Sequence, residues 1–183
     1  MWLLFSFLTV YVSKIVFIVF DLIGKLPQLF NRPRIKAFRV IAVAAGAVLF
    51  LTMWWGALVN RYAIDTVPVE FSDPTLPQSF DGYRIAQISD LHVGTFGEDT
   101  TFVSRLVDTI NALHPDLIVF TGDIVNSRSS ELAPHTAPLS RLRATDGVLS
   151  ILGNHDYGDY ANWQSPQAKA QNLANLKSMQ KSM

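Results

Sequence analysis

Two long apolar runs dominate the first sixty positions of the chain. Residues 40–59 (VIAVAAGAVLFLTMWWGALV) contain twenty consecutive residues without a charge, the length that a helix needs to cross the hydrocarbon core of a bilayer. A helix in the core of a soluble protein is rarely apolar on every face for this long. We therefore predict a transmembrane helix over 40–59, with Trp54 and Trp55 near the membrane interface.

The earlier apolar run, residues 2–23, is interrupted by Lys14. A lysine near the bilayer centre costs about 2.5–3.5 kcal/mol on insertion scales, which the surrounding apolar residues can offset. This run therefore predicts a second membrane span, an interfacial helix or two shorter segments. A signal peptide fits poorly, because Lys14 breaks the apolar stretch and no basic region precedes it.

The segment between the two runs, residues 25–39, is basic. It contains no acid and five cations, namely Lys25, Arg32, Arg34, Lys36 and Arg39. An ordinary solvated charge cluster can have the same composition. The place of this segment between two apolar runs favours a role in setting the membrane topology instead. The positive-inside rule puts this loop in the cytoplasm. We therefore expect a protein of the cell membrane whose residues from Arg61 onward are extracytoplasmic.

The pattern changes after a linker at 61–82, which is rich in turn-forming residues and in which VPVEF at 67–71 can form a short edge strand. Short apolar runs predict three strands, the last two buried: Tyr83–Ser89, Leu117–Phe120 and Gly147–Leu152. Helical spacing or helix-prone composition predicts three helices: Glu98–Leu113, a short one around Leu139–Arg143, and Gln164–Met183. This alternation predicts βαβ units with parallel pairing, an α/β fold.

Charge separates the same parts of the chain. Residues 1–60 hold six Lys/Arg and one Asp, whereas residues 61–183 hold nine Lys/Arg and fourteen Asp/Glu. We therefore divide the chain into a membrane anchor (1–60), a linker (61–82) and an α/β domain (83–183). The acidic half has no evident nucleic-acid surface, so a metal is the obvious source of positive charge for binding a phosphate group.

The chain contains no cysteine, which excludes disulfides and thiolate zinc sites. A metal must then use carboxylate, imidazole, amide or water ligands, a set that suits Mn, Fe, Zn or Mg.

Candidate ligands of this kind follow each predicted strand. Asp90 and His92 follow the first strand, Gly122-Asp123 the second, and Gly153-Asn154-His155-Asp156 the third. Ligands bind outside the carboxyl ends of the strands in open α/β sheets, and parallel strands bring these ends to one edge. Each cluster alone is a weak signal, since an aspartate after a strand is more often a loop cap. Three such clusters in this order, each after a predicted strand, are together a strong signal.

The residue types suit a pair of cations. Asp90 and His92 are two residues apart, so in an extended chain they point the same way and can hold one cation. Asp123 offers two oxygens that can bridge two cations, and Asn154 offers an amide oxygen to the second. Two metals roughly 3.5–4 Å apart suit in-line attack on phosphorus. His155 can stabilise or protonate the leaving oxygen.

Several neighbouring residues allow two interpretations each. Asp156 either orients a neighbouring ligand or caps a turn. Asn126 either touches the site or lies in a solvated loop. Tyr160 and Trp163 either line a substrate edge or, as we prefer, pack. His114 fits a helix end, and His135 fits a solvated loop.

At these clusters the chain resembles the calcineurin-like metallophosphoesterase family, whose pattern is D-x-H, then G-D, then G-N-H followed by D or E. The phrases ISDLHVG, VFTGDIVN and GNHDYG are similar to its bacterial membrane-anchored branch. The resemblance implies a four-layer α/β/β/α sandwich, of which this chain supplies the N-terminal half after one or two transmembrane helices. It also implies hydrolysis of a phosphomonoester or phosphodiester with two divalent metal ions, Mn, Fe or Zn.

The resemblance also assigns roles. It gives Asp90, His92 and Asp123 to the first metal, Asp123 and Asn154 to the second, and a phosphate contact to His155. Some membrane-bound relatives act on nucleotide-linked lipids, so the implied substrates include lipid-linked phosphoesters.

The family pattern continues with a further His and a G-H-x-H element, but no His follows His155 here and no acid follows Asp159. We therefore expect a C-terminally truncated product or gene fragment that binds metal weakly and is itself inactive. A G-H-x-H element encoded in any frame after codon 183 would identify the chain as a fragment of an enzyme. The alternative is a catalytically inactive, membrane-anchored binding or scaffold remnant of the fold.

Overall fold

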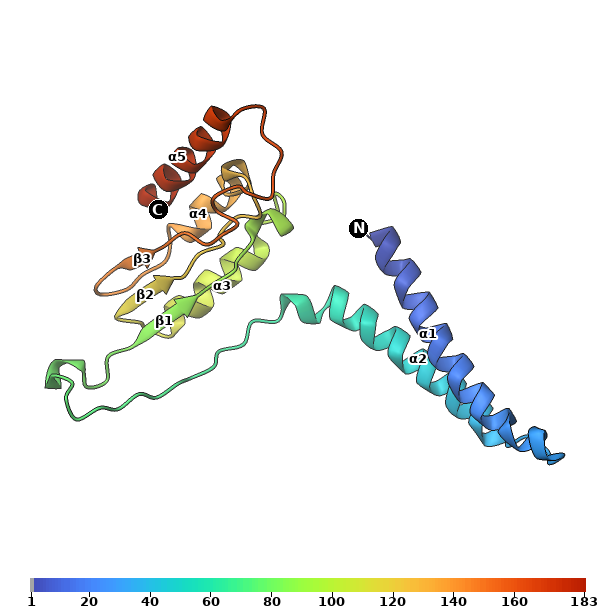
Figure 1. The fold of residues 1–183 in the computed structure, drawn as a ribbon. Coiled ribbons are helices and arrows are strands. Elements are labelled where there is room, and N and C mark those ends of the chain that lie inside the picture. The colour runs from blue at the N-terminus through green and yellow to red at the C-terminus, as the bar shows by residue number, and fades with distance from the viewer. Residues whose placement is uncertain (1) are drawn as a thin grey trace. The chain divides into compact units, whose positions relative to one another are not determined.

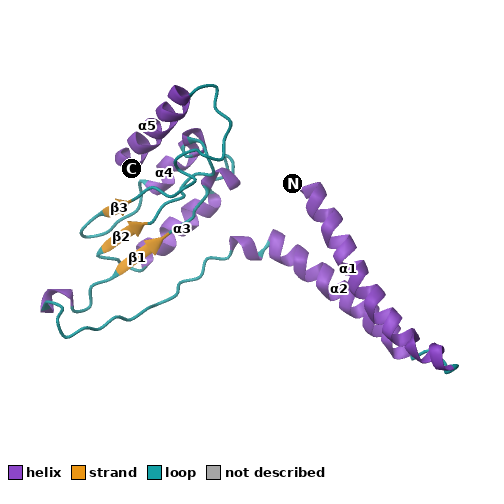
Figure 2. Cartoon of the chain, in the orientation of Figure 1, coloured by secondary structure: helices purple, strands orange, loops and turns teal. Residues whose placement is uncertain are grey.

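The computed structural model describes residues 2–183, which form two compact units. The first unit ends at Thr66 and the second begins at Val67. Figure 1 shows a helical hairpin in the first and a small sheet with helices in the second, and Figure 2 separates their helices from their strands.

The first unit contains two long helices, α1 (Trp2–Lys25, 24 residues) and α2 (Lys36–Leu58, 23 residues). At about 1.5 Å per residue each is roughly 35 Å long, which exceeds the roughly 30 Å hydrocarbon core of a bilayer. Both are apolar enough to cross a membrane. The run at 2–23 is thus one continuous helix, and Lys14 lies within it with its Nζ 5.3 Å from the centroid of the Tyr11 ring.

The two helices pack closely because small residues lie where they meet. The buried residues of this pair are Thr9, Gly24, Ala42 and Gly46. A Cβ at Gly24 would lie 2.7 Å from the Cβ of Phe38, so this contact excludes any larger residue. Small residues at such contacts are typical of helix pairs in membranes, because they let the two backbones approach closely and pack.

The second unit is built on a parallel sheet in the order β1-β2-β3. The strands are β1 (Ile85–Ile88), β2 (Leu117–Phe120) and β3 (Val148–Ser150). The helices are α3 (Thr101–Ala112), α4 (Thr136–Leu139) and α5 (Pro166–Ser182). The predicted α/β class with parallel pairing, preceded by two apolar helices, is therefore confirmed.

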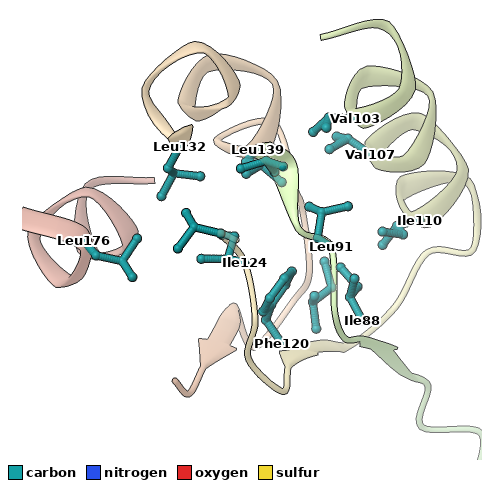
Figure 3. Close-up of a cluster of buried hydrophobic side chains, with 13 residues drawn as sticks. Ile88, Leu91, Val103, Val107, Ile110, Phe120, Ile124, Leu132, Leu139 and Leu176 are labelled. Carbon is teal, nitrogen blue, oxygen red and sulfur yellow. The ribbon is translucent and has the colours of Figure 1, made fainter. Parts of the chain in front are cut away.

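The hydrophobic core lies on one face of this sheet (Figure 3). Ile118 and Phe120 of β2 are buried, and α3 adds its periodic residues Val103, Val107 and Ile110. Leu176 brings α5 into the same cluster, and Met179 of the same helix packs against it.

The opposite face of the sheet is open. Ile85, Leu149 and Ile151 remain 59%, 60% and 61% exposed. The prediction that Gly147–Leu152 forms a buried strand is therefore wrong: β3 is an edge strand, and no helix in the described part of the chain covers this face.

Two further local predictions are also wrong. Residues 67–71 form no strand; Pro68 lacks an N–H, and Val69 and Phe71 are 85% and 78% exposed with no neighbouring strand. His135 is not solvated but fully buried, with its Nε2 2.9 Å from the carbonyl oxygen of Gly97, because it lies at the start of α4, which packs near α3.

Candidate metal centre

The three predicted clusters meet at the carboxyl edge of the sheet. The chain after β1 runs beside the chain after β2, since the N–H of Asp90 donates to the carbonyl oxygen of Gly122 and the N–H of His92 to that of Asp123, both over 3.0 Å. The parallel register thus continues past the strands into the loops that carry the polar side chains.

Two glycines let the ends of β2 and β3 approach. Gly122 has φ +106°, a conformation that residues with a Cβ rarely adopt. A Cβ there would lie 2.6 Å from the Cα of Gly153, and a Cβ at Gly153 would lie 2.6 Å from the Cγ of Asp123. The backbone therefore bends sharply at Gly122, and any side chain at either position would separate the two loops.

Asp156 holds this junction together. Its carboxylate is fully buried and accepts three backbone N–H groups, from Asp123 at 2.8 Å, Gly153 at 3.0 Å and Val125 at 3.2 Å. Three donors offset the cost of burying a charge. Of the two readings of Asp156, the structure supports the one in which it positions a neighbouring ligand, since its partner Asp123 carries a candidate ligand side chain.

One compact group of possible metal ligands emerges from residues 2–183. His92, Asp123 and His155 each offer one ligand atom, and these atoms lie within 4.8 Å of one another. The two imidazole rings lie edge to face with their centroids 4.6 Å apart. Asp123 is 8% exposed, so a cation bound there would be partly shielded from water.

Asp90 lies at the margin of this group. Its Oδ1 is 3.8 Å from His92 Nε2, and its side chain is 64% exposed. The two residues do not lie in an extended chain as predicted, because both adopt left-handed backbone conformations, with φ +54° and +45°. They approach one another through this turn instead.

Asn154 is exposed, and its amide donates from Nδ2 to the hydroxyl of Tyr160 over 2.8 Å. This bond leaves Oδ1 as the atom available to a cation. The ring of Tyr160 stacks on that of His155 at a centroid distance of 4.2 Å. Tyr160 therefore borders the site, although packing was the preferred reading of its sequence position.

His155 is fixed on two sides. Its backbone N–H donates to Asp123 Oδ1 over 2.7 Å, and its Nδ1 lies 2.8 Å from the carbonyl oxygen of Asn126. A carbonyl oxygen only accepts, so Nδ1 carries the proton in this bond. In the neutral ring Nε2 then has a free lone pair, which can bind a cation or take up a proton.

Glu131 holds the backbone of Asn126 in position. The Glu131 carboxylate accepts the N–H of Asn126 over 2.6 Å and that of Arg128 over 3.2 Å. A Cβ at Gly94, in the loop after His92, would lie 2.7 Å from the carboxyl carbon of Glu131. No sequence motif predicts either contact, since Asn126 acts through its backbone N–H and carbonyl oxygen.

The donor set fits a divalent metal. It combines two imidazole nitrogens with carboxylate oxygens and an amide oxygen nearby, a mixture that suits Zn, Fe or Mn better than Ca. The charge fits too, because a cation would face the carboxylates of Asp90 and Asp123.

Comparison with known proteins gives the family that the three sequence motifs resemble. The family model for calcineurin-like phosphoesterases matches residues 83–180. A zebrafish (Danio rerio) transmembrane protein with metallophosphoesterase domain is 33% identical over 87% of this chain and 38% of its own length. An uncharacterized metallophosphoesterase of Bacillus subtilis is 41% identical over 65% of this chain and 42% of its own length.

A UDP-2,3-diacylglucosamine pyrophosphatase of Chlamydia muridarum is 37% identical over 66% of this chain and 36% of its own length. This chain thus spans about two fifths or less of the length of these relatives. No solved structure gave a significant match. On the family match and the three motifs, the chain belongs to the calcineurin-like phosphoesterase family.

Proposed function

We propose that this chain is part of a membrane-anchored, metal-dependent phosphoesterase that hydrolyses a phosphomonoester or phosphodiester. The observation that carries the proposal is the convergence of His92, Asp123 and His155, whose ligand atoms lie within 4.8 Å of one another at the carboxyl edge of a parallel sheet. The proposal keeps the division expected above: anchor 1–60, linker 61–82 and α/β domain 83–183.

The site is proposed to be binuclear. Asp90, His92 and Asp123 would hold one cation, and Asp123 and Asn154 would hold the other. The Asp123 carboxylate keeps one oxygen for this role after Oδ1 accepts the His155 N–H. When bound, divalent metals polarise the phosphoryl group and lower the pKa of water. Mn, Fe or Zn fits the donors.

His155 is proposed to contact the phosphate and to hand a proton to the leaving oxygen. Asn126 fixes the Nδ1 side of the ring, so Nε2 is the atom that takes up and donates the proton. The Tyr160 ring stacks on the imidazole ring of His155 and restricts its orientation. The same Nε2 can instead serve as a ligand with His92 and Asp123, and the two roles differ in one readout: only a ligand role makes His155→Ala lower metal affinity.

A lipid-linked phosphoester is the substrate class we favour. The support is the similarity to a UDP-2,3-diacylglucosamine pyrophosphatase together with the two apolar helices. The basic loop 25–39 is proposed to be cytoplasmic and the α/β domain extracytoplasmic. A reporter enzyme active only outside the cytoplasm, fused after residue 75, tests this orientation; a silent reporter would reverse it.

The activity is tested with bis(p-nitrophenyl) phosphate and Mn²⁺. Because the chain spans only part of its relatives, the test compares it with the product of any longer reading frame that contains it. We expect little turnover by the chain alone and metal-dependent turnover by the longer protein. Asp123→Asn should abolish this turnover and Asp159→Asn, an exposed residue paired with Lys169, should leave it unchanged. Metal-independent background in both proteins would instead favour the catalytically inactive remnant.

A further inference from the structure

A groove of about 660 Å³ lies where α2 begins, far in the sequence from the proposed catalytic residues. Three cations line it, Arg34, Lys36 and Arg39, and three apolar residues continue it along the helix, Val40, Val43 and Ala44. Arg34 precedes α2, whereas the other five residues lie on one face of the helix, since Lys36 is followed three or four residues later by Arg39 and Val40 and these by Val43 and Ala44.

The polar end of the groove carries uncompensated positive charge. The first turn of α2 contains no acid, and its N-cap residue, Ile35, gives no side-chain cap. The helix dipole adds further positive potential at this end. Lys36 and Arg39 have no carboxylate partner within residues 2–183.

The one nearby acid is already engaged. Asp21 is the only acid in residues 1–60, and it pairs with Lys25 at 2.7 Å and with Arg34 at 2.6 Å. The second bond holds the Arg34 guanidinium in place at the groove. Its Nε is buried and has no hydrogen-bond partner in the described chain, so one donor beside the groove remains to be satisfied.

The apolar end of the groove is open. Val40 and Val43 are 72% and 57% exposed. A small anion at the cationic end would leave both valines uncovered. A ligand with a phosphate group and an acyl chain would satisfy both ends, because its chain would lie along α2 in the direction of the bilayer.

We propose that this groove binds an anionic phospholipid, with its phosphate at Arg34, Lys36 and Arg39 and an acyl chain along Val40, Val43 and Ala44. Basic pockets at the cytoplasmic ends of membrane helices bind anionic lipid headgroups in this way. The inference rests on the membrane anchoring proposed above and does not depend on the catalytic site.

The test is native mass spectrometry of the full chain, released from micelles that contain equal amounts of phosphatidylglycerol and phosphatidylcholine. We expect one phosphatidylglycerol retained per chain in preference to phosphatidylcholine. Arg39→Gln and Lys36→Gln should each reduce retention about fivefold. Arg32→Gln is the matched control, because it removes one charge from the same loop outside the groove, and it should change retention little. Ala44→Trp keeps every charge but fills the apolar end, and it should also reduce retention.

Three results would overturn the lipid site. Equal losses in Arg32→Gln and Arg39→Gln would indicate a diffuse charge effect, and unchanged retention in Ala44→Trp would exclude an acyl chain from the groove. Displacement of the lipid by millimolar inorganic phosphate would show a simple anion site. Alkaline carbonate extraction of the chain from vesicles separates this failure from failure of the anchor, since a chain without membrane helices would be released.

Discussion

The backbone N–H of Asp123 donates over 2.8 Å to the carboxylate of Asp156, a residue 33 positions later in the chain. This bond joins the loop after β2 to the loop after β3 and sets the place of the Asp123 side chain. Asp156 is thus a positioning residue, and its own carboxylate is too deeply buried to meet a substrate.

Asp156→Asn should destabilise the second unit by about 3 kcal/mol, because an amide group presents a donor to N–H groups that need an acceptor. Denaturant unfolding in detergent, followed by near-ultraviolet circular dichroism, measures the change. Asp159→Asn is the control, since its exposed pair with Lys169 should be worth less than about 1 kcal/mol. Equal losses in the two variants would contradict the positioning role.

Gly122→Ala should cost several kcal/mol and weaken metal binding, since its φ is +106° and the new Cβ would meet the Gly153 backbone. Gly147→Ala separates these two causes. Gly147 has φ +93° but nothing within 4 Å of its Cβ position, so its variant should lose only the backbone strain of about 1–3 kcal/mol. Thermal unfolding and Mn²⁺ titration provide the measurements. If both variants lost the same stability and bound Mn²⁺ alike, the close approach would not matter.

The two faces of the sheet should respond differently to truncation. Ile118→Ala empties a fully buried position and should cost about 2–5 kcal/mol. Leu149 lies on the open face and is 60% exposed, so Leu149→Ala should cost less than about 1 kcal/mol. Denaturant midpoints compare the two. A larger loss for Leu149→Ala would mean that the open face is covered in solution.

Tyr83 should give the protein a pH dependence at high pH. Its hydroxyl donates to Asp146 Oδ2 over 2.6 Å, and this bond, with the charge of Asp146, raises the pKa of Tyr83 from 10.0 to about 12. The raised pKa means that the neutral form is favoured in the folded state. The stabilisation is therefore complete below pH 10 and is lost as the pH rises toward about 12.

The measurement is spectrophotometric titration of tyrosine ionisation, compared between the native chain and Tyr83→Phe. The native chain should show one additional tyrosine that ionises near pH 12. Asp146→Asn should move that ionisation toward lower pH. Superimposable titrations of the native chain and Asp146→Asn would remove the proposed cause.

Sequence pattern predicts the parts of this fold that local chemistry determines. Apolar runs ending in Gly-Asp or Gly-Asn predict β2 and β3, and parallel order then brings Asp123 and His155 to one edge. Pattern fails where tertiary contacts decide. The left-handed turns at Asp90 and His92 depend on backbone bonds to the neighbouring loop, which no side-chain spacing encodes.

Sequence pattern also fails to predict which of these residues are buried. The apolar composition of Gly147–Leu152 matches a buried strand, but its exposure depends on whether another layer covers the sheet. His135 is polar and lies between loops, yet α4 carries it into the interior. Tyr160 reaches the site only because the turn after His155 folds its ring back onto the imidazole.

The convergence of His92, Asp123 and His155 is tested most directly by Co²⁺ binding, followed by visible absorption of the cobalt ion in the full chain. We predict that the native chain binds Co²⁺ and that His92→Ala and Asp123→Asn each lower its affinity by at least about tenfold. His114→Ala, which changes an exposed histidine at the end of α3, should bind like the native chain. Equal affinity in all four proteins would contradict a metal centre at this edge of the sheet.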